Sequence, residues 1–493
     1  MLLERVTGDD DRHEAFPVAL TPAAPPRATP QPEAIAEWGG HVLDALPELL
    51  PDPAVDLLRR QPPRRRSGAG PAPVVGHDTV SAVVETLLDL DRSYLAVQGP
   101  PGTGKTYVGS RVIARLVREH GWRVGVVGQS HAVVENVLRA AITAGVDPER
   151  VGKVPKSGTT AEQADEQPWR SLKSGGEAAF LAEADGGAGG AGHNGGGQAV
   201  GAVFGATAWG FANADKVARA SLDLLVVDEA GQFSLASTVA ASVAATRLLL
   251  LGDPQQLPQV SQGSHPEPVD ESALGWLADG HDVLPAEFGY FLATTWRMHP
   301  ALCAPVSELS YGGALTSHAS DRRLDGLAPG LHVEPVQHVG NTTSSIDEAR
   351  AVVEIVRSVV GLAWSDADGT RPLTPADVIV VAPYNAHGAL LREHLDAAGF
   401  AETPVGTVDL FQGQEAVVSV VSLAASSAAD IPRGLDFLLM PNRLNVALSR
   451  AKWAAFLVHS PLLATGLPTS IAGLGLLSGF LRLTGQGQPA VRA

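Results

Sequence analysis

The chain has 493 residues, enough for two or three domains, and 45% of them are hydrophobic, which supports buried cores. No apolar run approaches the roughly 20 residues that a membrane-spanning helix needs, so the sequence predicts no membrane segment. The net charge of −17 disfavours broad electrostatic wrapping of nucleic acid but allows a local basic groove. The single cysteine, Cys303, excludes an internal disulfide, and with the acidic N-terminus it favours the cytoplasm.

Residues 1–73 differ in composition from the rest of the chain. Prolines interrupt the first part, and a stretch rich in proline and arginine ends it. We expect short helices between Ile35 and Leu58, within a partly disordered segment that ends in a linker. The arginines at 64–66 are more typical of a solvated charge cluster than of a phosphate contact.

From Val74 onward, buried strands alternate with amphipathic helices. Strands are expected at 94–98, 123–128, 202–207, 222–227 and 247–251, and helices at 80–90, 107–120 and 132–144. This order predicts a parallel sheet with right-handed crossovers. A glycine-rich insertion at about 183–198 has almost no side chains to pack, so we expect a disordered surface loop that is inert rather than a ligand cover.

A second α/β unit follows, with strands expected at 378–382, 405–408, 417–423 and 453–458. The sequence therefore predicts an α/β chain of two similar domains with a cleft between them. The expected boundaries are 74–289 for the first domain, 290–475 for the second and 476–493 for a C-terminal tail.

The segment between the first strand and the first helix of this pattern is a complete phosphate-binding loop, Gly99-Pro-Pro-Gly-Thr-Gly-Lys-Thr106. Inward-pointing backbone N–H groups and the helix N-terminus suit phosphate oxygens. Lys105 is expected to reach the β- and γ-phosphates of ATP, and Thr106 to ligate Mg²⁺. The predicted nucleotide contacts in this loop are Gly99, Pro100, Gly102, Thr103, Gly104, Lys105 and Thr106.

Acidic and amide side chains end two of the predicted strands. Asp228 is expected to hold Mg²⁺, and the adjacent Glu229 to polarise the attacking water. Gln256 closes another buried strand, where an uncharged amide can sense the γ-phosphate. All three are candidate catalytic residues, together with Lys105.

Two arginines in the second unit complete the predicted catalytic set. Arg297 and Arg450 suit the charge that develops on the γ-phosphoryl oxygens, because a guanidinium is planar and always charged. Trp296 is expected to stack on adenine, with a core tryptophan as the alternative. Gly413 and Glu415 are further candidate nucleotide contacts, Glu415 through a ribose hydroxyl.

Hydroxyl, amide and imidazole side chains at strand ends are candidate nucleic-acid contacts, since such groups bind phosphates without base specificity. They are Ser130, His131, Asn136, Thr207 and Thr407. For each of them a structural role stays equally open. His131 and His299 lack the spaced partner set of a metal site.

As an ordered set, these motifs resemble those of superfamily 1 helicases, in the group that includes the eukaryotic nonsense-mediated-decay helicase. The resemblance runs from about Gly99 to Val458. It rests on Gly252-Asp-Pro-Gln-Gln256, Trp296-Arg-Met-His-Pro300, Asp409-Leu-Phe-Gln-Gly-Gln-Glu415 and Asn445-Val-Ala-Leu-Ser-Arg450. It implies tandem RecA-like P-loop domains, Mg²⁺-ATP in the cleft, a single strand across the top, 5′-to-3′ travel and a monomer.

The resemblance also assigns roles to individual residues. It puts the seven charged and polar candidates on the nucleotide, namely Lys105, Thr106, Asp228, Glu229, Gln256, Arg297 and Arg450. Trp296 stands where the family commonly has an adenine-stacking tyrosine, and His131, Thr207 and Thr407 fall in blocks that contact the strand. The family's adenine-reading glutamine is not evident before the loop.

A closer likeness is to the C-terminal helicase half of bacterial RecB-like nuclease–helicase fusions, on residues 129–136 and 257–268. It implies a Mg²⁺-ATP-dependent translocase or helicase on single-stranded nucleic acid, with DNA favoured and RNA possible. The expected role is DNA repair or processing with a RecB-like nuclease encoded separately. The alternative is an ATP-switched binding module that regulates such a nuclease without productive unwinding.

Overall fold

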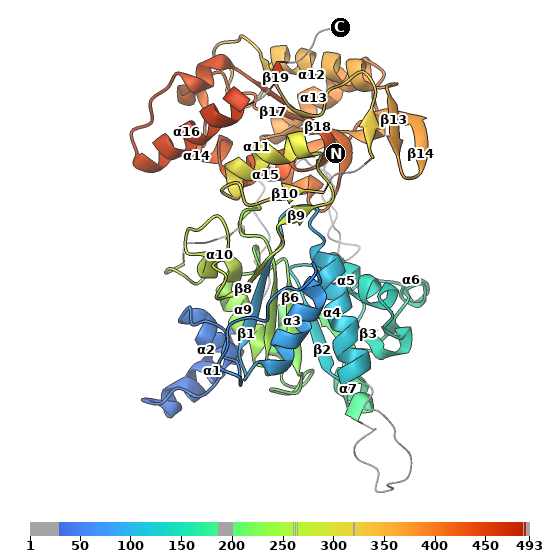
Figure 1. The fold of residues 1–493 in the computed structure, drawn as a ribbon, viewed down its shortest axis with the longest axis vertical. Helices are drawn as coiled ribbons and strands as arrows, with labels where there is room; N and C mark the ends of the chain where they lie inside the picture. Colours follow the sequence, from blue (N-terminus) through green and yellow to red (C-terminus); the bar gives the residue numbers. More distant parts are fainter. Residues whose placement is uncertain are drawn as a thin grey trace, which may run out of the picture.

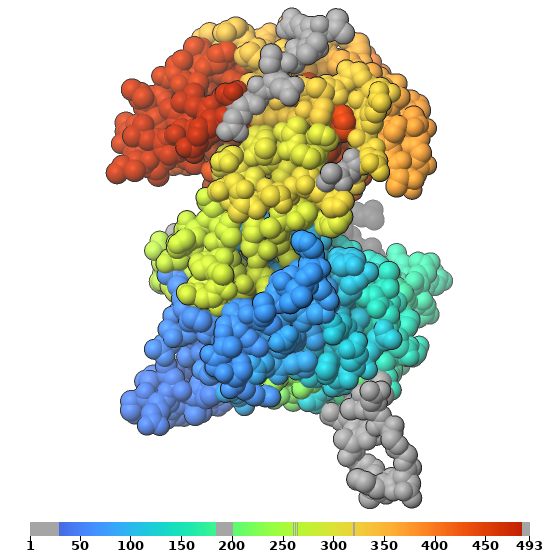
Figure 2. Space-filling view, in the orientation of Figure 1, coloured from blue at the N-terminus to red at the C-terminus, as the bar shows by residue number. Residues whose placement is uncertain are grey.

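The computed structural model describes residues 29–185, 201–259, 265–318 and 321–486, with 261, 263, 488 and 489. Two α/β domains follow one another along the long axis of the molecule (Figure 1). Figure 2 shows them as two lobes joined at a narrower waist. Each domain is built on a parallel sheet, so the predicted fold class, two tandem RecA-like α/β domains, is confirmed.

The first domain holds an eight-stranded sheet in which every pair of neighbours is parallel. Its order is β4 (Arg170–Ser171), β3 (Val151–Lys153), β5 (Ala202–Ala206), β2 (Arg123–Val127), β6 (Leu224–Asp228), β7 (Leu248–Gly252), β1 (Tyr94–Gln98) and β8 (Gly289–Phe291). Because all strands point the same way, their carboxyl ends, which carry the predicted motifs, meet at one edge.

Helices cover both faces of this sheet. One face packs against α3 (Thr79–Asp89), α4 (Lys105–His120) and α5 (His131–Thr143). The other packs against α2 (Pro53–Leu58), α8 (Ala208–Ala212), α9 (Leu235–Ser242) and α10 (Ala273–Ala278). Alternate residues of a strand serve opposite faces: Leu249 and Leu251 lie in the first core, Leu248 and Leu250 in the second. The short α6 (Ala161–Asp165) and α7 (Glu177–Asp185) lie beyond, near β3 and β4.

The second domain holds a six-stranded parallel sheet with helices on both faces. Its order is β16 (Val405–Thr407), β15 (Val378–Ala382), β17 (Ala416–Ser422), β18 (Ala451–His459), β12 (Gly330–Pro335) and β19 (Gln488–Pro489). One face carries α12 (Ile346–Val359) and α13 (Asn385–Ala397). The other carries α11 (Pro300–Ser310), α14 (Leu435–Leu438), α15 (Pro441–Leu448) and α16 (Ile471–Gln486).

Two small sheets flank this domain. β9 (Thr294–Thr295) pairs with β10 (Thr316–Ser317) at the junction between the domains. β11 (Arg323–Leu324), β13 (Ala363–Asp366) and β14 (Gly369–Pro372) form an antiparallel sheet at the side.

The expected boundaries at 289 and 475 fall inside elements. The boundary at 289 cuts β8, which pairs with β1 as the edge strand of the first sheet, so the first domain continues to Phe291. The boundary at 475 cuts α16, whose Phe480 and Leu483 are buried in the core of the second domain. An edge strand of three residues such as β8 gives too short an apolar run to detect in the sequence.

The N-terminal segment packs against the first domain where it is described. α1 (Gln31–Ala45) and α2 fall in the predicted region of short helices, and Leu57 is buried in the first domain. The arginines at 64–66 are not a free charge cluster, because Arg64 pairs with Asp56 and Arg65 with Asp89, each at 2.8 Å.

The glycine-rich insertion expected to be disordered lies outside the described residues from 186 on, as does the N-terminal segment up to residue 28. Within the described parts of the chain, no helix is both long and apolar enough to cross a bilayer.

Candidate functional site

The phosphate-binding loop connects β1 to α4 at the carboxyl edge of the first sheet (Figure 1). The Gly99 N–H donates to the Gly252 carbonyl at 2.8 Å, which fixes the loop against the end of β7. Gly102 and Gly104 have φ angles of 75° and 86°, which favour glycine. The Lys105 Nζ donates to the Gly99 carbonyl at 2.8 Å, so the lysine folds back across its own loop.

The two acids at the end of β6, Asp228 and Glu229, differ in environment. Asp228 is buried, and burial and the Glu229 charge raise its pKa to about 7 against the opposing charge of Lys105. Glu229 is half-buried, with a φ of 54°, a left-handed conformation that costs about 1–3 kcal/mol in a non-glycine residue. Such strain is typical of active sites, where neighbouring contacts hold the residue in place.

Close backbone packing holds this turn. The Ala230 N–H donates to the Leu251 carbonyl at 2.8 Å, and the Gln232 N–H donates to the Glu229 carbonyl at 2.7 Å. A Cβ at Gly231 would lie 2.3 Å from the Asp253 carbonyl oxygen, so only glycine fits there. The turns after β6 and β7 therefore form one packed unit.

Gln256 does not point freely at the expected phosphate position, because its Nε2 donates to Asp253 Oδ2 at 3.2 Å. Asp253 is buried and also accepts from the Tyr311 hydroxyl at 2.7 Å. Burial raises the pKa of Asp253, and the charge of Lys105 and the Tyr311 hydrogen bond oppose that shift. The sequence analysis missed Asp253 and Tyr311, although Asp253 lies in the same motif as Gln256.

A second-domain amide completes this interdomain contact. Asn445 Nδ2 donates to the Tyr311 hydroxyl and to the Gln255 carbonyl, each at 2.8 Å. Asn442 Nδ2 donates to the Pro254 carbonyl at 2.9 Å. The start of the predicted Asn445–Arg450 motif thus contacts the loop after β7 rather than a nucleotide position.

Arg297 lies against the phosphate-binding loop. The Trp296 N–H donates to the Gly102 carbonyl at 2.9 Å, and Thr295 Oγ1 donates to the Pro101 carbonyl at 2.9 Å. A Cβ at Gly102 would lie 2.4 Å from the Arg297 Cβ. The segment that enters the second domain therefore touches the loop predicted to hold ATP.

Ionic contacts to Glu415 hold the Arg297 guanidinium. Its Nε lies 2.9 Å from Glu415 Oε2, and its Nη1 donates to the Ser449 carbonyl at 3.1 Å. Lys452 Nζ lies 2.9 Å from the other Glu415 oxygen. Burial alone would raise the pKa of Glu415, but the Lys452 hydrogen bond and the Arg297 charge hold it below its usual value. Glu415 is thus placed beside Arg297, with Gly413 in the exposed turn before it.

Arg450 is buried behind this ion pair and donates to backbone carbonyls. Its Nε donates to Val446 at 2.9 Å, and its Nη1 donates to Phe411 and Gln414 at 3.3 Å. Burial and the Arg297 charge lower the pKa of Arg450 to about 9, while Glu229 of the first domain opposes the shift. Arg450 therefore stays cationic at neutral pH and interacts with a catalytic candidate across the junction.

Trp296 is 57% exposed, which excludes the alternative of a core tryptophan. Its ring stacks on His318 with centroids 4.0 Å apart, a contact that the sequence analysis missed. An exposed indole next to the phosphate-binding loop has the geometry for stacking on a base.

Four of the five candidate nucleic-acid contacts lie at or just beyond the carboxyl ends of strands, and their surroundings differ. Ser130 caps α5 by accepting from the Val133 N–H, and His131 Nδ1 lies 2.9 Å from the Lys153 ammonium. Burial and the Lys153 charge lower the pKa of His131. Asn136 is exposed on α5, while Thr207 and Thr407 are half-buried at the ends of β5 and β16.

The oxygen donors near the loop fit Mg²⁺, which keeps several waters and takes one or two protein oxygens plus phosphates. Thr106 offers an exposed hydroxyl at the start of α4, and Asp228 offers a carboxylate at the end of β6. Among the residues that the structure describes, no group of three or more His, Cys, Asp or Glu side chains forms a metal cage.

Comparison with known proteins gives matches that agree with the two-domain geometry of the site. Two family models, each described as an AAA domain, match residues 80–273 and 271–461. An uncharacterized ATP-dependent helicase of Caenorhabditis elegans is 32% identical over 183 residues, 34% of this chain and 11% of its own length. The regulator of nonsense transcripts 1 homolog of Drosophila melanogaster is 25% identical over 463 residues, 82% of this chain and 36% of its own.

Another relative is named as both a helicase and a nuclease. The DNA replication ATP-dependent helicase/nuclease of Xenopus laevis is also similar, with 25% identity over 393 residues, 74% of this chain and 35% of that protein. The chain spans roughly a tenth to a third of the length of these relatives. The phosphate-binding loop and the paired α/β domains are in keeping with the helicase names that two of these relatives carry.

Proposed function

We propose that this chain is a superfamily 1 helicase that hydrolyses Mg²⁺-ATP between its two domains and uses the cycle to move along single-stranded nucleic acid. The observation that carries the proposal is the contact of the Trp296–Arg297 segment with the phosphate-binding loop. An arginine supplied across a domain junction makes hydrolysis depend on how the domains sit, which is what couples a chemical step to movement.

The position of each candidate residue suggests its role in ATP hydrolysis. The loop N–H groups and Lys105 bind the phosphates, while Thr106 and Asp228 hold Mg²⁺, which neutralises phosphate charge when bound. Glu229 orients the attacking water and takes its proton. Arg297 and Arg450 stabilise the charge on the γ-phosphoryl oxygens, a contribution of about 10³–10⁵ in rate in related chemistry. Release of Gln256 from Asp253 lets its amide sense the γ-phosphate.

Trp296 supplies a stacking surface for adenine, and Gly413 and Glu415 lie on the second-domain side of the same junction. Single-stranded nucleic acid crosses the carboxyl edges of the two sheets. There, Ser130, His131, Asn136, Thr207 and Thr407 are its proposed contacts.

The finer assignments are also proposals. DNA is the favoured strand, travel is 5′-to-3′, and the chain works as a monomer in DNA repair or processing. A RecB-like nuclease encoded separately is the proposed partner, in keeping with the name helicase/nuclease that one relative carries. The buried free thiol of Cys303 fits a cytoplasmic protein.

A second candidate function is an ATP-switched module that docks to a nuclease without productive movement. The hydrogen bond between Gln256 and Asp253 favours it, because it ties the γ-phosphate sensor to the interdomain contact. The placement of Glu229 and both arginines near the loop favours turnover instead, since a switch needs little hydrolysis.

Steady-state ATP hydrolysis with and without single-stranded DNA, and then RNA, tests the proposal. Strong stimulation that disappears in Lys105→Ala but persists in Lys173→Ala, an exposed lysine of the first domain, supports a motor and identifies its strand. Turnover that neither strand changes would leave the switch as the better account. Displacement of streptavidin from biotin at the 3′ or the 5′ end then reports direction.

A further inference from the structure

Two aromatic rings are stacked at the junction between the domains, on the two-stranded β9–β10 sheet (Figure 1). Trp296 directly follows β9, and His318 directly follows β10. Their ring centroids lie 4.0 Å apart, and their planes differ by 23°. The imidazole therefore lies flat against one face of the indole.

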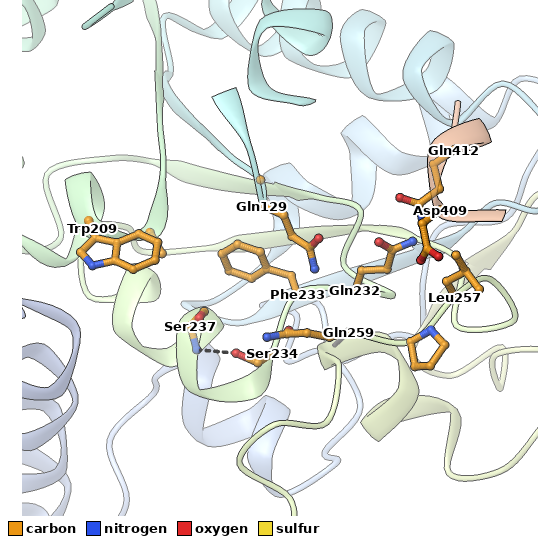
Figure 3. A pocket seen from close by; sticks show the side chains of 13 residues that line it. Gln129, Trp209, Gln232, Phe233, Ser234, Ser237, Leu257, Gln259, Asp409 and Gln412 are labelled. Atoms are coloured by element: carbon orange, nitrogen blue, oxygen red, sulfur yellow. Dashed lines mark hydrogen bonds between the residues drawn. The ribbon is translucent and has the colours of Figure 1, made fainter. Parts of the chain in front are cut away.

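This stack is separate from the cavity of about 540 Å³ that both domains line (Figure 3). The described residues around that cavity include Trp209 and Asp409, but neither Trp296 nor His318. The stack instead belongs to the phosphate-binding loop, because the Trp296 N–H donates to the Gly102 carbonyl at 2.9 Å.

The second face of the indole is open. Trp296 stays 57% exposed although His318 covers one side of its ring, so the exposed surface is mainly the opposite face and the ring edges. His318 is itself exposed, so the two rings do not form part of a buried core. An open aromatic face beside a phosphate-binding loop suits a nucleotide base, since every base can stack on such a face.

Hydrogen bonds fix the backbone of both residues. The Trp296 carbonyl accepts from Arg322 Nη1 at 3.1 Å, and the His318 N–H donates to the Thr295 carbonyl at 2.9 Å. Thr295 Oγ1 in turn donates to the Pro101 carbonyl of the phosphate-binding loop. The two ring-bearing residues thus keep their places relative to each other and to the loop.

The orientation of the indole ring depends on the stack. Within the described part of the chain, neither the indole N–H of Trp296 nor a ring nitrogen of His318 has a hydrogen-bond partner. An exposed side chain that nothing holds loses conformational freedom when a ligand orders it, and that loss weakens binding. A ring that is already held avoids this cost.

We propose that His318 is a positioning residue for the nucleotide base: its imidazole holds the Trp296 indole so that the base stacks on the open face. The inference rests on the proposed function, in which Trp296 stacks on adenine, and it adds the residue that prepares that stack. His318 touches no part of the nucleotide in this arrangement. Because both rings belong to one small sheet, they move together when the domains move.

The test compares a ligand that has a base with one that has none. Displacement of a ribose-labelled fluorescent ATP analogue from the full chain measures the affinities of ATP and of magnesium tripolyphosphate. His318→Ala should weaken ATP binding by roughly fivefold and leave tripolyphosphate binding and kcat unchanged. His318→Phe should restore ATP binding, because a phenyl ring can stack on the indole without any ring nitrogen.

A double-mutant cycle separates positioning from a general structural effect. Trp296→Ala should weaken ATP binding at least as much as His318→Ala does. Adding His318→Ala to Trp296→Ala should then change nothing more, since no indole is left to hold. His120→Ala, at the exposed end of α4, is the control and should keep both affinities.

Unchanged ATP affinity in His318→Ala would overturn the inference, and so would an equal loss of ATP and tripolyphosphate affinity. Tighter ATP binding by His318→Ala would overturn it as well, because the imidazole would then occupy the place of the base. In each case, strand-stimulated hydrolysis by the wild-type chain would still stand. A wild-type chain that neither binds nor hydrolyses ATP would overturn the proposed function itself, and the stacking role with it.

Discussion

The Tyr311 hydroxyl of the second domain donates a 2.7 Å hydrogen bond to the Asp253 carboxylate of the first. The same carboxylate oxygen accepts from the Gln256 amide, and Asn445 donates to the Tyr311 hydroxyl. A buried carboxylate thus links the predicted γ-phosphate sensor to a helix of the other domain. When Gln256 turns toward a phosphate, Asp253 keeps Tyr311 as its partner and stays paired.

Tyr311→Phe should therefore destabilise the chain. It removes a hydrogen bond to a buried carboxylate and leaves Asn445 short of a partner, so the free energy of unfolding should fall by about 1–3 kcal/mol. Urea denaturation measures the change.

Tyr384→Phe is the matched control, because the Tyr384 hydroxyl is buried without a partner. Its removal should change stability by no more than about 0.5 kcal/mol. If the two variants were equally destabilised, the hydroxyl contact with Asp253 would not be the stabilising element.

Gly102→Ala should weaken ATP binding. Its Cβ would lie 2.4 Å from the Arg297 Cβ, so the phosphate-binding loop or the arginine segment must move. Gly434→Ala separates this clash from backbone strain, since Gly434 has a similar φ of 77° with nothing within 4 Å of the added Cβ. Titration with a fluorescent ATP analogue should show a loss of at least about tenfold for Gly102→Ala alone. Similar affinity in both variants would place the Arg297 segment away from the loop in solution.

Arg450→Lys should abolish most hydrolysis while the fold persists. The guanidinium reaches three backbone carbonyls from the buried side of the Arg297 site, and a single ammonium cannot reproduce that fork. We expect turnover to fall by about 10³-fold or more, with ATP affinity changed far less. Arg433→Lys changes an exposed arginine and should leave turnover as it is. Near-normal turnover in Arg450→Lys would assign that arginine a purely structural role.

Stability should fall in mild acid because of His387. Burial and the nearby His338 charge lower the pKa of His387 from 6.5 to about 4, against Glu348. The unfolded state then binds more protons between these values, so the stability is fully present above pH 6.5 and is lost as pH falls toward 4. The single group accounts for about 2 kcal/mol between pH 7.5 and pH 5.

Unfolding free energies of wild type and His387→Asn at the two pH values measure this contribution. The wild type should lose about 2 kcal/mol more than the variant, since other titrating groups cancel in the difference. His120→Asn, at the exposed end of α4, should show the wild-type loss. A variant that loses as much as wild type would mean that His387 is protonated in the folded chain.

The sequence was most informative where a buried strand ends in a motif. The strand 94–98 was predicted to the residue, as was 378–382, because each is an apolar run bounded by polar residues. Edge strands such as β8 and the β13–β14 hairpin were not predicted, since two to four residues are too few to establish the alternating pattern of a strand. The described part of the N-terminal segment also packs more closely than its composition predicted.

Within the candidate site, motifs located residues but not their partners. Arg297 and Glu415 are 118 positions apart and were assigned separate roles, yet they form one ion pair. Tyr311 stands outside every motif, and its role depends on Asp253 and Asn445 from distant segments. Contacts of this kind depend on how two domains meet, which no local pattern encodes.

The connection between the domains has a thermodynamic consequence. From Phe291, which pairs with Gln98, to Trp296, which bonds to Gly102, the chain runs beside the phosphate-binding loop. This connection between the domains, residues 291–296, is therefore a hinge in direct contact with the phosphate-binding loop. By linkage, the free energy that a nucleotide gains from the approach of the domains is also the free energy by which the nucleotide favours that approach. A substitution that makes the hinge stiffer or looser would therefore change nucleotide affinity, even if every contact to the phosphates were kept.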